Sequence, residues 1–323
     1  MEMIDTLIVG AGPAGSTCAR DLHRAGRDAV LVDAAAFPRE KLCAGWVTPA
    51  CARDLELAAF PGGCLPLRRF VVHRGRATVR LPVQQYSVRR YELDDWLVRR
   101  SGVPCVRHTV ESVVRDGRDY VVDDRWRCRH IVGAGGSGCP VYRCLFRNDR
   151  PREPGSRIVA LEAEWAQPAT EPDCHLWFGD ERLPGYAWYV PKTGGYVNVG
   201  LGGHHDRLLA RGLRLDDLWR RLVDRLGERG WITSPPRPRG YRYYLRPHAA
   251  EPSGDGAYVV GDAAGLATRD LGEGIGPAAR SGRLAARAII SGRPPDWRDV
   301  GRFSIPSLLA SRLIRPPTLP PST

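Results

Sequence analysis

Lysine is almost absent from this chain of 323 residues. Only Lys41 and Lys192 occur among 48 basic residues, so arginine carries nearly all of the positive charge. The formal net charge of +12 favours anionic partners, such as a phosphorylated substrate, an acidic redox protein or an anionic membrane surface. No dense basic run interleaved with aromatic residues is present, so the sequence predicts no nucleic-acid binding.

Paired cysteine motifs and long apolar runs are missing as well. The nine cysteines include no C-x-x-C pair, so we expect neither a zinc site nor any other metal site. Their odd number and irregular spacing fit a reducing compartment. No stretch reaches the roughly 20 apolar residues of a membrane span, and no signal-peptide pattern precedes the first apolar run. We therefore expect a cytoplasmic protein that is soluble or in peripheral contact with a membrane.

The strongest pattern lies in the first 33 residues. A short apolar run leads into a G-x-G-x-x-G turn formed by Gly10, Gly12 and Gly15, and a helical segment and a second apolar run follow, ending at Asp33. In such a unit the first glycine allows a tight turn, the second lets the backbone approach a pyrophosphate, and the third lets helix and strand pack closely. The helix N-terminus offers unpaired N–H groups, and Asp33 can accept hydrogen bonds from a ribose. The unit predicts dinucleotide binding.

A second stretch, 133–138, also matches G-x-G-x-x-G. Pro140 follows almost at once, and no amphipathic helix develops before the proline-rich stretch near Pro151. Because the phosphate site of this motif needs a helix N-terminus, we predict no second nucleotide-binding domain here.

The rest of the chain alternates between strand-like and helix-like segments. The sequence predicts an α/β protein (α+β overall) in which a Rossmann-like domain carries an inserted, mainly antiparallel β-sheet domain. Within the insertion, a hairpin is expected over 68–82, strands over 157–202 and a helix over 206–226. The discontinuous first domain is assigned to 1–66, 89–150 and 250–300, the sheet domain to 67–88 and 151–249, and a short tail to 301–323.

Four separated stretches resemble the FAD-dependent oxidoreductases of the p-hydroxybenzoate-hydroxylase fold: GAGPAG at 10–15, GAGGSGCPVYR at 133–143, GDAAG at 261–265 and GEGIGPA at 272–278. Within that fold, FPREKLCAGWVTP at 37–49 and PGYAWYVPK at 184–192 resemble the geranylgeranyl reductase family. The resemblance covers most of the chain. It implies noncovalent FAD in a Rossmann-like FAD-binding domain, a substrate-binding sheet domain, and the activity of an FAD-dependent oxidoreductase.

The resemblance also assigns roles to residues. The pyrophosphate would bind at the glycine turn, the adenosine ribose at Asp33 and the ribityl chain at Asp262. The cofactor-binding set that it implies is Gly10, Gly12, Pro13, Ala14, Gly15, Asp33, Lys41, Cys43, Arg90, Asp262, Gly274 and Ile275. The pattern that lines the substrate cavity in this family is matched by Tyr186, Trp188 and Pro191.

Two of these assignments have alternatives. Cys43 is either a catalytic residue near the reacting carbon or a buried loop cysteine. Tyr186 and Trp188 alternate on one strand and should share a face, where they either hold a flat or extended apolar substrate or pack in the core.

The resemblance implies that reduced flavin transfers a hydride to a carbon–carbon double bond of an isoprenoid or other apolar substrate. An aromatic monooxygenase is the alternative, because the same fold hosts both reactions. A flavin-binding protein without turnover is a further alternative, motivated by a C-terminal region shorter than in longer members. Flavin halogenases are a third branch of the same fold, and they use a lysine between the glycine motif and a W-x-W-x-I-P segment to carry the halogen. No lysine occurs between Leu42 and Pro191, so the sequence disfavours halogenation.

The electron donor remains open between two classes. The chain has one dinucleotide unit, which FAD should fill, so NAD(P)H would bind only transiently at the flavin face. A small acidic protein of the ferredoxin or flavodoxin type is the other class, and the +12 charge favours it.

Overall fold

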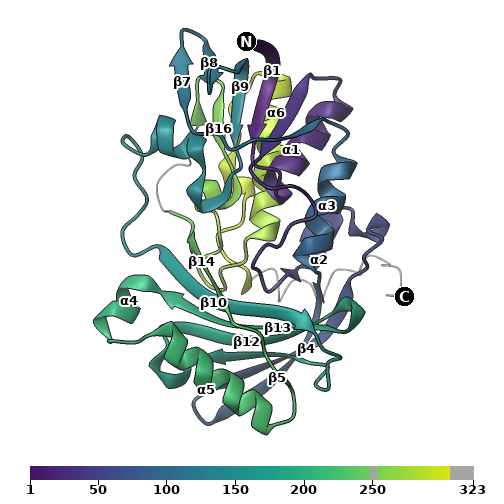
Figure 1. The fold of residues 1–323 in the computed structure, drawn as a ribbon, viewed down its shortest axis with the longest axis vertical. Helices are drawn as coiled ribbons and strands as arrows, with labels where there is room; N and C mark the ends of the chain where they lie inside the picture. The colour runs from purple at the N-terminus through teal and green to yellow at the C-terminus, as the bar shows by residue number, and fades with distance from the viewer. Residues whose placement is uncertain (248–252, 306–323) are drawn as a thin grey trace. The chain divides into compact units, whose positions relative to one another are not determined.

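The computed structural model describes residues 1–247 and 253–305, which form two compact units (Figure 1). The first unit comprises Met1–Arg39, Tyr91–Pro154 and Tyr243–Ser304. The second comprises Glu40–Arg90 and Gly155–Arg242, with Ile305 as its remaining described residue. Each unit contains one sheet. Most of the expected tail, 301–323, lies outside the described residues.

The sheet of the first unit is mainly parallel. Its strand order is β15-β16-β9-β1-β2-β6, and β7 and β8 extend it as an antiparallel pair beside β9. The pairings of β1 with β2 and β9, of β2 with β6 and of β16 with β9 are all parallel. The strand bounds are β1 (Glu2–Val9), β2 (Ala29–Asp33), β6 (Cys105–Arg107), β7 (Val113–Asp116), β8 (Asp119–Val122), β9 (Trp126–Gly133), β15 (Ser253–Gly254) and β16 (Ala257–Val259).

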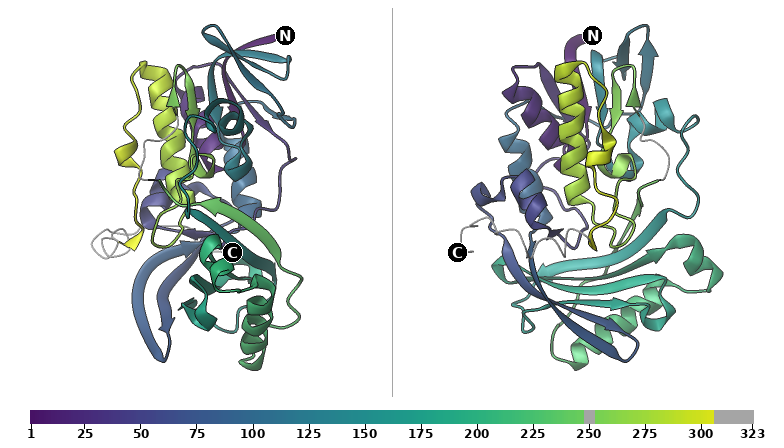
Figure 2. Two further views of the ribbon diagram at one scale, coloured as in Figure 1. Left: turned by 90° about the vertical axis from the view of Figure 1, so that its left-hand side faces the viewer. Right: turned by 180° about the vertical axis from the view of Figure 1, so that it is seen from behind.

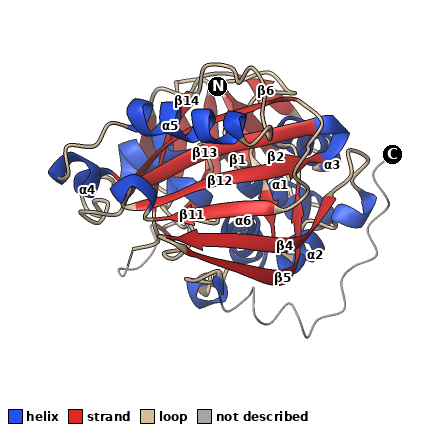
Figure 3. Ribbon diagram, turned by 90° about the horizontal axis from the view of Figure 1, so that it is seen from below, coloured by secondary structure: helices blue, strands red, loops and turns tan. Residues whose placement is uncertain are grey.

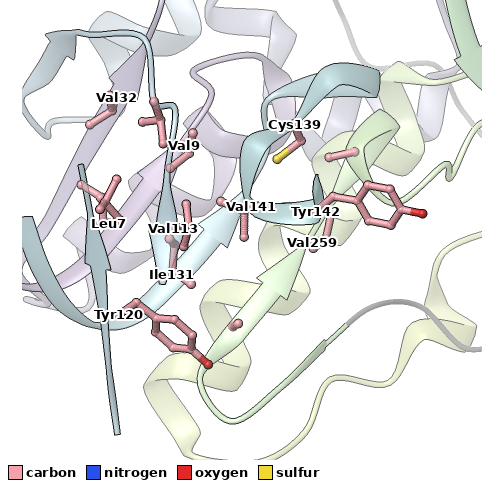
Figure 4. Packing of buried hydrophobic residues seen from close by; sticks show 14 of the residues in the cluster. Leu7, Val9, Val32, Val113, Tyr120, Ile131, Cys139, Val141, Tyr142 and Val259 are labelled. Atoms are coloured by element: carbon pink, nitrogen blue, oxygen red, sulfur yellow. The ribbon is translucent and has the colours of Figure 1, made fainter. Parts of the chain in front are cut away.

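Both faces of this sheet are covered, as parallel sheets require. Ile8 contributes to a core with α1 (Pro13–Arg24) and α6 (Ile275–Ser291), whereas Leu7 and Val9 belong to the core on the other face (Figure 4). The helices α1 and α6 lie side by side (Figure 2). They can approach because a Cβ at Gly282 would overlap the backbone of Ala14. The helix α3 (Arg90–Arg100) belongs to the first unit except for its first residue, Arg90, which ends the Glu40–Arg90 segment of the second unit.

The sheet of the second unit has the order β14-β10-β13-β12-β11-β4-β5-β3 (Figure 3). The pairs β10–β13, β13–β12, β12–β11, β4–β5 and β5–β3 are antiparallel, and β11–β4 is parallel. The hairpin predicted over 68–82 is confirmed as β4 and β5. The bounds are β3 (Trp46–Val47), β4 (Leu65–Arg74), β5 (Ala77–Ser87), β10 (Arg157–Ala166), β11 (Cys174–Phe178), β12 (Gly185–Lys192), β13 (Tyr196–His204) and β14 (Arg239–Tyr244).

Helices of the second unit are α2 (Pro49–Asp54), α4 (His205–Ala210) and α5 (Leu215–Glu228). The prediction of one helix over 206–226 was wrong at its centre. Gly212 has φ +62, and the N–H of Leu213 bonds back to Leu208, so the chain ends one helix and restarts another. The apolar stripe of α5, with Leu218 and Leu222, packs on one face of the sheet together with Val199.

The second glycine motif builds no α-helix, as predicted. Gly136–Gly138 forms one 3₁₀ turn after β9, and Tyr142–Phe146 forms a short π-type segment. After Gly274 the chain enters α6.

Candidate functional site

The glycine turn joins β1 to α1 at the carboxyl edge of the parallel sheet. Gly10 has φ +106, and a Cβ there would overlap the backbone of Ala134 after β9. A Cβ at Gly15 would overlap the carbonyl oxygen of Gly10. These two glycines are therefore required by the protein's own packing.

Gly12 differs from its two neighbours in the motif. An added Cβ would meet only the Arg39 guanidinium, at 3.6 Å, which is ordinary van der Waals contact. Gly12 precedes α1, whose first turn contains Pro13 and Ala14 and has no side-chain cap. The first N–H groups of a helix lack intrahelical partners, and with the positive end of the helix dipole they suit a phosphate. The space at Gly12 fits the close approach of a pyrophosphate.

Asp33, the last residue of β2, has a carboxylate beside the same turn. Its Oδ2 accepts a hydrogen bond from the N–H of Ala11 at 2.8 Å, and its Oδ1 accepts one from Ala35 at 2.9 Å. A carboxylate has about four lone-pair positions, so each oxygen can still accept from a ribose hydroxyl. Asp33 thus fixes the turn and can also contact a nucleotide.

Two more predicted residues lie together in the first unit. Asp262 is in a short turn after β16, and Gly274 precedes α6, which begins at Ile275. A Cβ built on Gly274 would lie 3.3 Å from Oδ1 of Asp262. Gly261 has φ +60 and is flanked by Ala14 and Ala278, so this turn packs against the starts of both long helices.

Sequence reasoning missed two arginines in the first unit. Arg39, which lies beside Gly12, pairs with the fully buried Asp94 at 3.4 Å. Arg152 donates hydrogen bonds to the backbone carbonyls of Asp262 and Ala263, at 3.4 and 3.1 Å, and to that of Ser137. Only the position of Arg39 within the quoted 37–49 stretch could have indicated it; Arg152 gave no signal.

The fit of these groups to FAD rests on three observations. Gly12 has space that the protein does not need, the starts of α1 and α6 both pack against the Gly261 turn, and the carboxylates of Asp33 and Asp262 lie at the carboxyl ends of β2 and β16 in the same sheet. Open α/β sheets bind ligands outside the carboxyl ends of their strands, where the strand order reverses. The first unit therefore provides groups suited to the pyrophosphate, a ribose and the ribityl chain.

The remaining predicted residues belong to the second unit, where Cys43 lies in a loop held by two buried side chains. Lys192 donates hydrogen bonds to the carbonyls of Ala44 and Val88, the latter at 2.9 Å. Asn198 donates to the carbonyl of Cys43 at 3.4 Å. The N–H of Gly45 approaches the Cys43 Sγ at 3.3 Å.

Lys192 is an uncommon case of a buried amine, with no exposed side-chain area. Burial lowers its pKa, and the Glu164 carboxylate 3.7 Å away opposes that shift. Arg90 lies close enough to lower the same pKa further, and Cys43 is among the groups that raise it. Lys41, two residues before Cys43, places its ammonium 3.1 Å from the centroid of the Tyr241 ring.

Tyr186 and Trp188 share one face of β12, as expected from strand alternation. Their ring centroids are 5.7 Å apart, and Phe178 on β11 lies 5.1 Å from Tyr186. The Trp188 Nε1 donates to Asn198 at 2.7 Å. Pro191 alternates to the other face, and its carbonyl accepts a hydrogen bond from Ser87 at 2.6 Å.

A buried carboxyl group completes this region, and the sequence analysis did not single it out. Glu162 on β10 is 4% exposed, and its position pairs with Gly200, which pairs in turn with Trp188. Burial raises the pKa of Glu162 to about 7, although Lys192 and Lys41 oppose the shift. In the sequence, Glu162 could have been recognised as an acidic residue at a core-facing position of a predicted strand.

Metal and membrane features are not found in the described part of the chain. Residues 1–247 and 253–305 contain no cluster of three His, Cys, Asp or Glu side chains able to hold a metal ion. In the same residues, no helix has the length and hydropathy needed to cross a bilayer.

The parallel sheet with its glycine turn and edge carboxylates defines the nucleotide domain of an FAD-dependent oxidoreductase. The family described as NAD(P)-binding Rossmann-like domain matches residues 8–39. The menaquinone reductase of Mycolicibacterium smegmatis is 32% identical, over 91% of this chain and 78% of its own length. The geranylgeranyl diphosphate reductase of Rhodobacter capsulatus is 28% identical over the same shares.

A solved structure of a geranylgeranyl bacteriochlorophyll reductase-like protein from Thermoplasma acidophilum superposes with a TM-score of 0.77. The match covers 97% of this chain and 83% of that chain at 19% identity, and therefore shows the shared fold. Together with the identity and coverage of the mycobacterial relative, these findings show that the chain belongs to the geranylgeranyl reductase family of FAD-dependent oxidoreductases.

Proposed function

We propose that this protein reduces carbon–carbon double bonds in a polyprenyl chain. The observation that carries the proposal is Asn198, which hydrogen-bonds both Trp188 and the backbone of Cys43. These two residues come from the two stretches that resemble the family, and they meet in one unit. The relatives named as reductases of menaquinone and of geranylgeranyl diphosphate support a substrate with an isoprenoid chain.

Residues of the two units have different roles in this proposal. The glycine turn, Asp33 and Asp262 hold FAD, which supplies a hydride when it is bound and reduced. Tyr186 and Trp188 contact the apolar chain, and Cys43 contacts the reacting part of the substrate. Lys192 and Asn198 are positioning residues, because their hydrogen bonds fix the Cys43 loop. The contribution of Pro191 is to fix the end of β12 through Ser87.

The test uses purified protein with its flavin reduced chemically under anaerobic conditions. Mixing with menaquinone or geranylgeranyl diphosphate should reoxidise the flavin, and mass spectrometry should find product heavier by H₂ for each reduced bond. Oxygen incorporation into an aromatic probe would support the monooxygenase alternative instead. Bound flavin that no donor reduces would support a binding protein without turnover.

We infer further that a small acidic redox protein reduces the flavin faster than NADPH does. The formal charge of +12 supports this inference, because opposite charge accelerates association. The G-x-G-x-x-G turn that opens α1 is assigned to FAD, and the 133–138 stretch opens no α-helix.

A further inference from the structure

Glu162 is a buried carboxyl group on the face of the second unit's sheet that also carries Trp188. It occupies a row across three strands, in which Glu162 pairs with Gly200 and Gly200 pairs with Trp188. Because Gly200 has no side chain, Glu162 and Trp188 can approach each other across it. A Cβ there would overlap the Trp188 ring and would lie 2.7 Å from the Glu162 Cβ.

One oxygen of this carboxyl group has an open hydrogen-bonding position. Glu162 is 4% exposed, and its Oε1 is buried without a hydrogen-bond partner among the described residues. Burial is the largest effect on this group and raises the pKa of Glu162 to about 7, in the same direction as the nearby Glu164; Lys192, Lys41 and a hydrogen bond with Asn198 oppose the rise. A buried acid of this kind can stay protonated at neutral pH.

Two charged neighbours of Glu162, Glu164 and Lys192, make hydrogen bonds or ion pairs with other groups. Glu164 on the same strand pairs with Arg89 at 3.2 Å and lies 3.7 Å from Lys192. The Lys192 amine donates to backbone carbonyls of the Cys43 loop. Glu162 is thus the carboxyl group that lies beside Trp188 with an unused oxygen.

We propose that Glu162 is the catalytic acid that protonates the substrate carbon during double-bond reduction. This inference rests on the proposed function. Hydride transfer to one carbon of the double bond leaves the other carbon in need of a proton. The Glu162 O–H bond breaks, a C–H bond forms at that second carbon, and the carboxylate then recovers a proton from water. The hydride and its two electrons come from reduced FAD, which is oxidised; a nicotinamide or a redox protein restores it.

The experiment compares wild-type protein with Glu162→Gln, which keeps the shape and the contact with Asn198 but cannot donate a carboxyl proton. FAD content and the rate of flavin reduction should be unchanged. Reoxidation of the reduced flavin by geranylgeranyl diphosphate or menaquinone should slow by about 100-fold or more, the usual contribution of a general acid. Glu162→Asp should recover part of this loss, because it restores an acid at a longer distance.

Two matched measurements separate a chemical role from a structural one. Glu181→Gln makes the same substitution at an exposed residue paired with Arg221, and it should behave as wild type. The wild-type reoxidation rate should fall as pH rises through about 7, where the Glu162 carboxyl ionises, and this fall should be absent from Glu162→Gln. An unimpaired Gln variant with the wild-type pH profile would overturn the role of Glu162.

A third measurement needs no substrate. Infrared difference titration of wild type against Glu162→Gln should show a protonated carboxyl that ionises near pH 7. A carboxylate already ionised at about pH 5, near the ordinary glutamate pKa, would overturn the proposal. If wild type reduces none of the polyprenyl probes, the proposed function fails and this role fails with it. If wild type is active and Glu162→Gln is equally active, only the role fails.

Discussion

Asp33 illustrates how a single side chain serves both the fold and the expected ligand. Its two oxygens accept hydrogen bonds from Ala11 and Ala35, and the remaining lone pairs are available to a ribose. Gly12, by contrast, is not required by the protein's own packing, so the space beside it is available to the ligand.

We expect Asp33→Ala to weaken FAD retention more than Cys43→Ala does. The aspartate change removes charge-assisted hydrogen bonds worth roughly 1.5–3 kcal/mol and also releases the Ala11 N–H of the glycine turn. Cys43→Ala should leave FAD bound and slow double-bond reduction. Flavin fluorescence titration and single-turnover kinetics measure the two effects. Unchanged turnover in the cysteine variant would remove Cys43 from the mechanism.

Glu162 should also make stability depend on pH in a defined direction. Its folded pKa of about 7 lies above the ordinary value of 4.5, so between these values the folded state binds more protons than the unfolded state. Stability therefore falls as pH rises from about 4.5 to about 7. At about pH 8, Glu162→Gln should be more stable than wild type by up to about 3 kcal/mol, and at about pH 4.5 this advantage should disappear. Thermal unfolding across pH checks this, and an equal difference at both pH values would contradict it.

At the scale of elements, the strands β4 and β11 bring two histidines together on the face opposite Glu162. His73 Nε2 and His175 Nδ1 are 2.9 Å apart, so one ring must donate its proton to the other. Burial lowers the pKa of His73 to about 4, and His175, Arg229, Arg225 and Arg80 lower it in the same direction. Of these groups, His175 lies on β11, Arg225 on α5, Arg229 directly after α5 and Arg80 on β5.

This histidine pair should make the second unit sensitive to acid. His73 binds fewer protons in the folded state than in the unfolded state between about pH 4 and its ordinary pKa of 6.5. The stability that the neutral ring contributes is complete above pH 6.5 and is lost as pH falls toward about 4. In His73→Gln this part of the acid-induced loss should be absent. Chemical unfolding at several pH values tests the difference, and identical pH slopes in both proteins would refute it.

The β4–β5 hairpin also has an unusual outer surface. Val79 and Leu81 share one face of β5 and are exposed by 51% and 39%, and Arg74 and Arg76 are exposed at the hairpin turn. Apolar and basic groups together suit an anionic lipid surface. We expect the protein to sediment with vesicles rich in phosphatidylserine and not with zwitterionic vesicles.

A double variant of the hairpin, Val79→Ser with Leu81→Ser, should weaken this vesicle binding, and added salt should weaken it further because it screens the arginines. The exposed Val114 on β7 provides a matched control as Val114→Ser, with unchanged binding expected. Equal sedimentation of the hairpin variant and wild type would exclude the hairpin as the contact.

At the scale of the whole molecule, the dominant property is the net charge of +12. It should steer an acidic redox partner to the protein at low ionic strength, and salt should slow this encounter. Anaerobic stopped-flow reduction with a ferredoxin, a flavodoxin and NADPH across a salt series measures both effects. We expect faster reduction by the proteins, with a rate that falls as salt rises. Rapid reduction by NADPH and salt-independent rates from the proteins would return the role of donor to the nicotinamide.

The sequence by itself determined the parts of this protein that depend on local geometry. A turn that needs glycine at two positions, a helix that starts directly after it and an acid at the next strand end can be read along the chain, because their spacing is set by one βαβ unit. The absence of an α-helix directly after the second glycine motif was also readable along the chain, because Pro140 follows the motif and no amphipathic pattern develops. The division of the 206–226 segment into α4 and α5 could not be read in this way, because it depends on Gly212, which adopts a left-handed conformation and ends α4.

Tertiary structure decided the features that depend on pairing between distant strands. Glu162, Gly200 and Trp188 become neighbours only through the register of β10, β13 and β12, and no local spacing specifies that register. The buried Lys192 at the Cys43 loop and Arg39 beside Gly12 likewise required three-dimensional placement. Burial is a property of the assembled sheet, so the raised pKa of Glu162 and the lowered pKa of His73 were decided at this level.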